Sequence, residues 1–298
     1  MIKKAQDKDI DQLKKIYDEC YGVEFRTFYF DHVFKPFNTY VIANEDDEII
    51  FTISVNRHPV WIADKKLNIS YLTGLYVKDH LILKKALSEV IDEMEHNDLL
   101  TFIDHKDHDH FKEFGFDVSY QMIIYTLERS QISMYSNKGI SDKATVLELR
   151  NIYQKFTNYF NGYQHRDSDH YQMMMKWLDA SHHRLLTYRN DNDDLEGYIV
   201  YYDNIDKIII KDFIYLNSIA FIKLLDQSLQ LRGISEFSLP KQLDISKILP
   251  NITGKMIDTI NVRLNDRDLF NRLYNTNILN INEVMALSKK PLFFNESY

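Results

Sequence analysis

Glycine is scarce in this sequence. Only 8 of its 298 residues are glycine, whereas average usage is about 7%. The nearest pair, Gly233 and Gly254, is 21 residues apart. A loop in which several glycines surround a phosphate therefore cannot form, which excludes the P-loop and the dinucleotide-binding fingerprint.

Cysteine and long apolar runs are also missing. Cys20 is the only cysteine, so the chain can form no internal disulfide, which fits a reducing compartment. Its place in a predicted helix indicates a buried apolar role. No apolar run approaches the ~20 residues that span a bilayer, and the lysines near Met1 are not followed by the apolar stretch of a signal peptide. We therefore predict a cytoplasmic protein that does not contact the membrane.

The charge balance is acidic. Lys and Arg number 36 and Asp and Glu number 44, which gives a formal net charge of −8. Such a chain is poorly suited to the phosphate backbone of nucleic acids, and it slightly favours cationic or neutral small ligands. Hydrophobic residues make up 45%, with 20 Tyr and 18 Phe, so the chain can build one large core or two of ordinary size.

The first 130 residues alternate between the two kinds of periodicity. A helix is predicted after Asp7, and helical spacing recurs over Phe25–Phe37 and Leu81–Glu95, where Leu83, Ala86, Leu87, Val90, Ile91 and Met94 share one face. Period-2 segments predict strands between these helices. The predicted strands are Ile2–Ala5, Tyr40–Ala43, Ile49–Val55, Leu67–Val77, Leu99–Ile103 and Phe116–Leu127.

The second half repeats this layout. Leu149, Ile152 and Tyr153 have the spacing of Leu13, Ile16 and Tyr17, which indicates a diverged internal repeat. A helical stretch at Tyr171–Leu178 precedes strands at Arg184–Tyr188, Gly197–Tyr202 and Ile208–Leu216, a helix at Ile219–Leu231 and a strand at Ile234–Leu239. We predict an α/β fold with mixed sheets, divided into residues 1–130, 131–255 and a short C-terminal segment, 256–298.

Three short motifs resemble tandem acetyltransferases of the GCN5-related (GNAT) superfamily, and more narrowly the enhanced-intracellular-survival (Eis-like) type. The motifs are Phe30-xxx-Phe34 with Asn38–Val41, Tyr71–Leu75, and Phe111–Phe116, which is similar to a Y-x-x-F-G-F/Y signature. The resemblance implies two GNAT-like domains and transfer of an acetyl group from acetyl-CoA to an amine of a small molecule or peptide. The family's sterol-carrier-like third domain is not expected in full, since about 40 residues remain after the repeat.

The resemblance also implies where acetyl-CoA binds. In GNAT proteins the fourth strand ends in a glycine-containing turn whose N–H groups hold the pyrophosphate. The corresponding residues here are Leu75, Tyr76, Val77, Lys78, His80, Leu81 and Ile82. This stretch contains no glycine and is about three residues shorter than the pattern. Asp79 places a negative charge where the resemblance implies a phosphate.

Catalytic residues follow from the resemblance in the same way. The chain's last residue, Tyr298, is implied to bring its C-terminal carboxylate into the site as the base. The signature tyrosine that protonates the leaving thiolate corresponds to Phe111, which has no proton to give. His110, Tyr120 or Tyr125 are the candidate replacements. The alternative for the apolar tail that ends in Tyr298 is simple packing against the body of the protein.

The run Asp104–His110 holds three imidazoles and three carboxylates. These groups are metal ligands, but their spacing matches no complete metal motif, so we interpret the run as a solvated polar loop and predict no metal. Three functions remain open. The first is an acyl-CoA-dependent N-acyltransferase, possible also as a homo-oligomer, and the second is a pseudoenzyme that binds a ligand or partner without transferring an acyl group. The third is a transferase with a different donor, such as an aminoacyl-tRNA, against which the acidic charge argues.

Overall fold

The computed structural model describes residues 2–21, 27–104 and 109–295. The chain forms two compact units, and neither is continuous in sequence. Unit 1 consists of Met1–Val60, Lys65–Ser119 and Thr259–Leu287, and unit 2 of Trp61–Asp64, Tyr120–Asp258 and Ser288–Tyr298. The boundaries predicted at residues 130 and 255 mark where the sequence layout repeats, whereas the two units are defined by contacts within the fold. The predicted boundaries therefore stay a prediction.

Unit 1 is a mixed sheet in the strand order β1-β2-β3-β4-β5-β13. Strands β4 and β5 are parallel, whereas β5 and β13 are antiparallel. Its strands are β1 (Lys3–Lys4), β2 (Thr39–Ala43), β3 (Ile49–Ile62), β4 (Lys65–Val77), β5 (Leu100–Asp104) and the end of β13 (Gly254–Leu264). Its helical segments are η1 (Asp7–Asp9), α1 (Ile10–Tyr21), η2 (Tyr29–Val33), η3 (Pro36–Asn38), α3 (His80–Glu95), α4 (Asp109–Lys112), α8 (Arg267–Tyr274) and α9 (Ile281–Met285).

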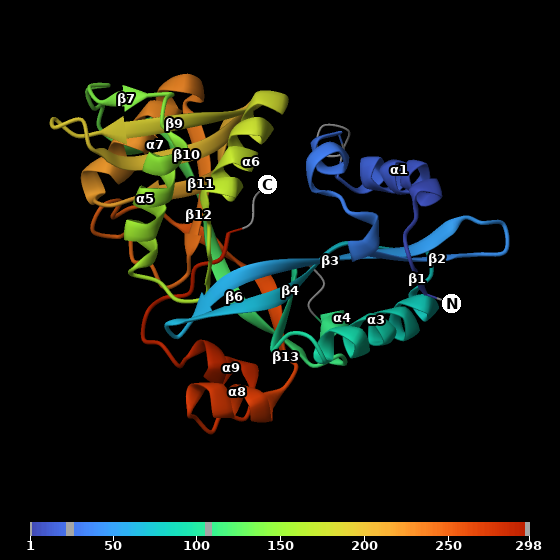
Figure 1. Cartoon of the computed structure of the whole chain (residues 1–298). Coiled ribbons are helices and arrows are strands. Elements are labelled where there is room, and N and C mark those ends of the chain that lie inside the picture. The colour runs from blue at the N-terminus through green and yellow to red at the C-terminus, as the bar shows by residue number, and fades with distance from the viewer. Residues whose placement is uncertain (1, 22–26, 105–108, 296–298) are drawn as a thin grey trace. The chain divides into compact units, whose positions relative to one another are not determined.

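The two faces of the unit 1 sheet bury different helices. Adjacent residues of a strand point to opposite faces. Tyr40 accordingly packs in the cluster of α3, while Val41 packs with Leu13 and Ile16 of α1. The six α3 side chains predicted to share a face are all buried in that cluster. Figure 1 shows α1 and α3 on opposite sides of this sheet.

Unit 2 repeats the arrangement, with the strand order β6-β12-β11-β10-β9-β7. Strands β11 and β12 are parallel, whereas β6 and β12 are antiparallel. Its strands are β6 (Phe116–Glu128, from Tyr120), β7 (Ile140–Ser141), β8 (Tyr163–Gln164), β9 (His183–Arg189), β10 (Leu195–Asn204), β11 (Lys207–Tyr215) and β12 (Ile234–Pro240). Its helices are η4 (Arg129–Gln131), α5 (Val146–Thr157), α6 (Ser168–Ala180) and α7 (Ser218–Arg232).

The internal repeat predicted from the sequence is present in this layout. Helix α7 packs against one face of the unit 2 sheet, with Leu186, Ile199 and Phe213 among the buried residues. Helices α5 and α6 contact the strands from the other side (Figure 1). Strand β6 ends the first repeat but pairs with β12 in unit 2. Strand β13 ends the second repeat but pairs with β5 in unit 1.

Several local predictions differ from the structure. Strand β3 continues to Ile62 rather than ending at Val55, because the alternation resumes after the exposed Arg57. The helix expected over Phe25–Phe37, with Pro36 as its stop, is present in its described part from Thr27 to Val33, although Tyr29–Val33 is the π-helical turn η2, and the separate 3-10 turn η3 begins at Pro36. Cys20 is exposed on α1 rather than buried, although its spacing continues the apolar stripe of Leu13, Ile16 and Tyr17, and it lies in the last turn of the helix.

Candidate functional site

Strand β4 (Lys65–Val77) contains Gly74 near its end. Its described pairing with β5 covers Ser70–Leu72 against Thr101–Ile103, and residues 105–108, which follow β5, lie outside the described part of the chain. Gly74 has φ +63°, a conformation that favours glycine. A Cβ at this position would overlap the hydroxyl of Tyr17 and lie 2.8 Å from its Cζ. Glycine is therefore required here by both the backbone conformation and the close approach of a buried tyrosine.

The predicted cofactor segment spans the end of β4 and the start of α3. Leu75, Val77 and Ile82 pack against the α3 core cluster, and Tyr76 packs against the α1 cluster. Leu81 is largely exposed, and His80 is the first residue of α3. Alternation along β4 thus places the side chains of Leu75, Tyr76 and Val77 on alternate faces of the strand.

The start of α3 is capped by Asp79. Its carboxylate accepts a hydrogen bond from the N–H of Leu81 at 2.9 Å, and the N–H of Ile82 donates to the Asp79 carbonyl at 3.0 Å. The adjacent Lys78 places its Nζ 2.7 and 2.8 Å from the carboxylate of Glu48, which lowers the pKa of Glu48 and raises that of Lys78. Both the helix N-terminus and the nearest cation are thereby engaged within the chain.

This geometry does not fit a pyrophosphate at the start of α3. Anion binding there depends on N–H groups that are open to the ligand, and Asp79 already accepts from one of them. A phosphate about 4 Å from this carboxylate would be repelled by about 1–4 kcal/mol, depending on the local dielectric. Acetyl-CoA held in the way that the GNAT resemblance implies is therefore disfavoured at its diphosphate.

A row of polar side chains lines β3 on the face toward α1. Thr52, Ser54, Asn56 and His58 occupy every second position, so they share one face. The hydroxyl of Ser54 lies 2.8 Å from that of Thr39 and 3.5 Å from those of Tyr17 and Tyr29. Asn56 donates to the hydroxyl of Thr73 on β4 at 3.2 Å. We refer to Thr52, Ser54, Asn56 and His58 as the polar row.

His58 ends the polar row beside β4. Its ring lies edge-on to Tyr71, with the centroids 5.4 Å apart. Burial lowers the pKa of His58 to about 4, so its imidazole is neutral near pH 7 and can both donate and accept a hydrogen bond. The row was missed in the sequence, although polar residues at every second position of an otherwise apolar strand are a readable signal.

The predicted acid and base residues are divided between the units. His110 is exposed on α4 in unit 1, beside Phe111, which is buried in the α3 cluster and contacts Phe116. Tyr120 is buried in unit 2, where its hydroxyl donates to the Gly162 carbonyl at 2.7 Å and burial raises its pKa. Tyr125 also belongs to unit 2 and stacks on Phe237. Nothing here brings these residues together, and their catalytic roles stay predictions.

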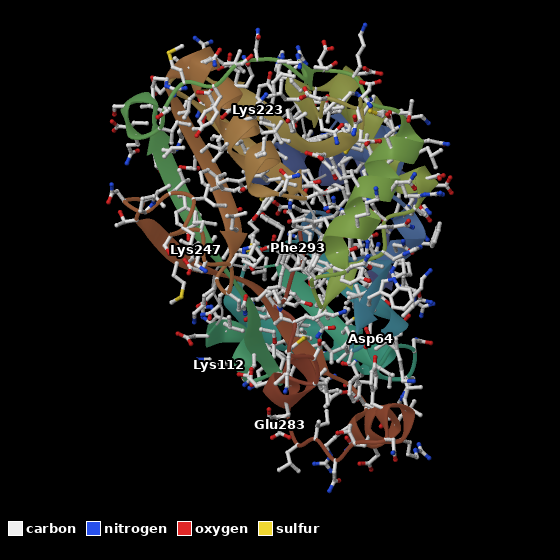
Figure 2. The ribbon with its side chains drawn as sticks, turned by 90° about the vertical axis from the view of Figure 1, so that its left-hand side faces the viewer. Asp64, Lys112, Lys223, Lys247, Glu283 and Phe293 are labelled. Carbon is white, nitrogen blue, oxygen red and sulfur yellow. The ribbon has the colours of Figure 1, made fainter. Side chains whose placement is uncertain are left out.

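The C-terminal tail packs within unit 2 as far as it is described. Phe293 is buried against Phe156 and Phe160 (Figure 2), and Phe294 lies against Tyr120. The main chain around Leu292 pairs with Asn161, whose N–H donates to the Pro291 carbonyl at 2.8 Å. Tyr298, the predicted base, lies outside the described residues.

The structure describes only part of the His/Asp run, since residues 105–108 lie outside the described residues. Within the described part of the chain, no group of three or more His, Cys, Asp or Glu is arranged to hold a metal ion. Among the described residues no helix combines the length and the apolar character that crossing a bilayer requires.

Comparison with known proteins identifies the fold. A GCN5-related N-acetyltransferase from Anabaena variabilis ATCC 29413 superposes with a TM-score of 0.73 at 14% identity, over 89% of this chain and 73% of that one. A probable N-acyltransferase from Enterococcus faecalis V583 superposes with a TM-score of 0.69 at 11% identity, over 89% and 72%. Eis1 from Mycobacterium abscessus gives 0.62 at 14% identity, over 89% and 74%.

Sequence comparison alone finds no such likeness. No family model matches the chain, and no curated protein matches it. At the low identities of the structural matches the likeness establishes the fold. The chain has an α/β fold of tandem GNAT-like acyltransferase domains with a short C-terminal segment, similar to the Eis type, as the motifs implied.

Proposed function

We propose that the chain is a GNAT-fold N-acyltransferase whose reaction takes place in unit 1, with an amine of a small molecule or peptide as the acceptor. The observation that carries this proposal is the polar row of β3, which lies beside Tyr71 and Thr73 of β4. In the proposed reaction, main-chain N–H groups at the end of β4 would polarise the carbonyl of the thioester. The fold similarity to N-acetyltransferases supports the same reaction class.

The acceptor site follows from the chemistry of the polar row. An amine needs hydrogen-bond acceptors, and Ser54, Asn56 and His58 can supply them without a fixed charge. The thioester would supply the acyl carbon that the amine attacks. Within unit 1, His110 is the acid of the scheme that we predict. The Tyr298 carboxylate as base and Tyr120 as an alternative acid belong to unit 2 and stay predictions of the resemblance, and the Tyr120 hydroxyl donates to the Gly162 carbonyl.

The donor is the part of the proposal that departs from the family. The carboxylate of Asp79 stands where the resemblance places a phosphate, and Lys78 is paired with Glu48. Recognition of the donor would therefore rest on its thioester arm rather than on its nucleotide. A short thioester without any phosphate is expected to serve about as well as acetyl-CoA.

A second function is favoured by the same residues. Asp79 at the start of α3 and the buried Phe111 are independent departures from the GNAT pattern. Together they fit a protein that keeps the fold and binds a ligand without transferring an acyl group. The two functions differ in one observable, which is whether any thioester is consumed.

The test compares two donors on two proteins. Acetyl-CoA and S-acetyl-N-acetylcysteamine are offered to the wild type and to Asp79→Gly, with spermidine, tyramine and a dipeptide as acceptors and product detection by mass spectrometry. We expect kcat/KM for the two donors to agree within about tenfold in the wild type. Asp79→Gly should raise the value for acetyl-CoA alone. The short donor is the internal control, because it carries no phosphate.

Two results would count against the donor assignment, and a third against acyl transfer itself. Strong preference of the wild type for acetyl-CoA would contradict the donor assignment. An Asp79→Gly effect on both donors alike would show that the carboxylate does not act on the phosphates. Consumption of neither donor by either protein, at up to about 1 mM donor, would leave the binding-protein function as the better description.

A further inference from the structure

Unit 2 contains a cavity of about 530 Å³ that the proposed reaction does not use. It lies along α5 and β8 and is closed on one side by Trp61. A volume between about 300 and about 1,000 Å³ is usual for small-molecule sites. The residues that matter for its chemistry are Trp61, Tyr153, Lys155, Tyr163, His165 and Arg166.

The lining of this cavity differs in charge from the rest of the protein. Among the described residues no Asp or Glu lines it, although acidic residues outnumber basic ones 44 to 36 in the chain. A second cavity of the same volume, in unit 1, is lined by Glu95, Asp117, Asp266 and Asp268. The cavity in unit 2 is therefore the one of the two that suits an anion.

Three aromatic rings form its walls. Trp61 and Tyr163 are half-buried, so part of each ring faces the space, while Tyr153 is buried and donates its hydroxyl to the Gln164 carbonyl at 2.8 Å. The indole Nε1–H of Trp61 donates to Nδ1 of His165 at 3.4 Å. Nδ1 of His165 is thus an acceptor toward the indole, and its ring lies beside Trp61 with the centroids 6.5 Å apart. Flat rings suit a planar ligand.

Positive charge lies at the base and at the rim. Arg166 is buried, stacks 4.4 Å from the Tyr153 ring centroid, and is held by Asp212 at 2.6 Å and by the Asn295 carbonyl at 2.6 Å. Because Asp212 neutralises it, the uncompensated charge of the lining is that of Lys155 at the exposed rim. The nearest carboxylate that acts on Tyr163 is Asp64 (Figure 2), which is exposed and 3.9 Å from Lys290.

We propose that this cavity binds a planar aromatic acid, whose ring packs against Trp61 and Tyr163 and whose carboxylate meets Lys155 and His165. The site belongs to unit 2 alone and does not depend on acyl transfer in unit 1. Both the aromatic walls and the absence of lining carboxylates are needed for this ligand. A neutral ring would lose the contact with Lys155, and an aliphatic acid would lose the stacking.

The two tryptophans of the chain make the test specific. Trp177 is buried in α6 against His183, outside the cavity, so Trp177→Phe leaves Trp61 as the only indole. In this variant 4-nitrobenzoate, which quenches tryptophan on contact, is titrated against its neutral counterpart 4-nitrobenzamide. We expect saturable quenching by the acid with Kd below about 1 mM and binding of the amide at least about tenfold weaker.

Variants of the lining distinguish the contribution of the Lys155 charge to binding from that of the aromatic walls. Lys155→Ala should weaken 4-nitrobenzoate about three- to tenfold and leave 4-nitrobenzamide unchanged. Lys247→Ala, an exposed lysine of unit 2 outside the lining (Figure 2), is the matched control and should change neither. Tyr163→Ala should weaken both probes, because it removes a wall. Calorimetry on the wild type checks that Trp177→Phe has not created the site.

The proposal is overturned by any of three results. These are linear, non-saturating quenching by both probes, equal affinity for the acid and the amide, or the same loss in Lys247→Ala as in Lys155→Ala. Failure of thioester turnover in unit 1 has no bearing on this outcome. Asp79→Gly should leave probe binding unchanged.

Discussion

The two units carry different polar groups on the corresponding face of their sheets, neutral hydroxyls in unit 1 and an ion pair in unit 2. In unit 1 the face toward α1 carries neutral groups, with the hydroxyls of Thr39, Ser54, Tyr17 and Tyr29 in one cluster. In unit 2 the face toward α5 and α6 carries a fully buried ion pair between Arg166 and Asp212. A neutral cluster can exchange its partners for a ligand at little cost, whereas a buried charge needs its partner.

The ion pair of unit 2 also holds distant parts of that unit together. Asp212 of β11 accepts from Tyr198 at 3.1 Å, and Asn295 of the tail donates to Asp212 at 3.1 Å while its carbonyl accepts from Arg166. These groups belong to two strands, the segment before α6, and the C-terminal tail. The buried polar groups of unit 2 are thus held by an ion pair, whereas those of unit 1 can exchange their hydrogen-bond partners. This difference fits the proposed assignment of the reaction to unit 1.

The largest effect is expected from breaking the ion pair. Arg166→Met leaves the Asp212 carboxylate buried without its charge partner and should lower the free energy of unfolding of unit 2 by about 3–5 kcal/mol. Chemical denaturation monitored by Trp177 fluorescence measures it, since Trp177 lies in α6. Adding Asp212→Leu to Arg166→Met should recover part of the loss. A loss below about 1 kcal/mol would show that the pair is not what fixes unit 2.

A smaller effect is expected at Gly74 in unit 1. Gly74→Ala combines positive-φ strain with overlap on the Tyr17 hydroxyl, so it should cost about 2–4 kcal/mol. Gly233 in unit 2 is the matched control, because it has φ +75° but nothing within 4 Å of a new Cβ, and Gly233→Ala should cost only about 1 kcal/mol. Thermal unfolding of both variants makes the comparison.

A double variant sharpens the assignment of strain at Gly74. Tyr17→Phe removes the oxygen that the new Cβ would meet, so Gly74→Ala should be less destabilising in that background. Equal losses in both backgrounds would mean that the backbone conformation alone requires the glycine. Equal losses for Gly74→Ala and Gly233→Ala would remove the case for a special contact in unit 1.

Much of this fold was readable because its signals are local. The apolar face from Leu83 to Met94 depends on helical spacing alone, and each of its residues is buried as predicted. The repeat was visible because Leu149, Ile152 and Tyr153 repeat the spacing of the first helix, and all three are buried. Gly74 lies in the motif Tyr71–Leu75, and its φ of +63° explains why the motif has glycine at this position.

The rest depended on contacts between residues far apart in sequence. Asn56 and His58 were missed because the exposed Arg57 and Pro59 end the apolar pattern of β3. No local feature reveals that Arg166 meets Asp212, which is 46 residues away. The pairing of β13 with β5 joins Ile260 to Asp104 across most of the chain. Local periodicity carries no information on such pairings.

In the described part of each unit a histidine is held neutral by folding, which predicts the pH dependence of stability. Burial lowers the pKa of His58 in unit 1 to about 4. Burial, and then the charges of Lys211, His182 and Arg184, lower that of His183 in unit 2 to about 4. The unfolded chain takes up these protons near pH 6.5 and the folded chain does not. Stability should therefore be complete above about pH 6.5 and fall as the pH drops toward 4.

The loss should be about 1–2 kcal/mol for each histidine, because partial exposure reduces the full effect of the shift. Denaturation midpoints measured between about pH 4 and pH 8 should flatten in His58→Gln for unit 1 and in His183→Gln for unit 2. A variant that keeps the slope of the wild type would exclude its histidine as the source. Lowered stability at high pH would contradict the sign of both shifts.

The smallest effect concerns the two helices that follow the central strands. Asp79 caps α3 by accepting from the N–H of Leu81, and Asn217 caps α7 by accepting from the N–H of Ala220 at 2.9 Å. Asp79→Ala and Asn217→Ala should each cost about 1 kcal/mol. Asp79→Asn keeps a capping oxygen and removes the charge, so it should cost only a few tenths, about 0.3 kcal/mol.

That last variant separates the two roles of Asp79. If the carboxylate excludes phosphate by its charge, Asp79→Asn should strengthen binding of acetyl-CoA at low salt, and the gain should shrink as the ionic strength rises. If it excludes phosphate by occupying the N–H of Leu81, only Asp79→Gly should help, since the amide of Asn217 in α7 shows that an uncharged cap fills the same position. Calorimetric titrations of the two variants at two salt concentrations decide between them, and a cofactor response in neither would place the obstacle in the shortened turn itself.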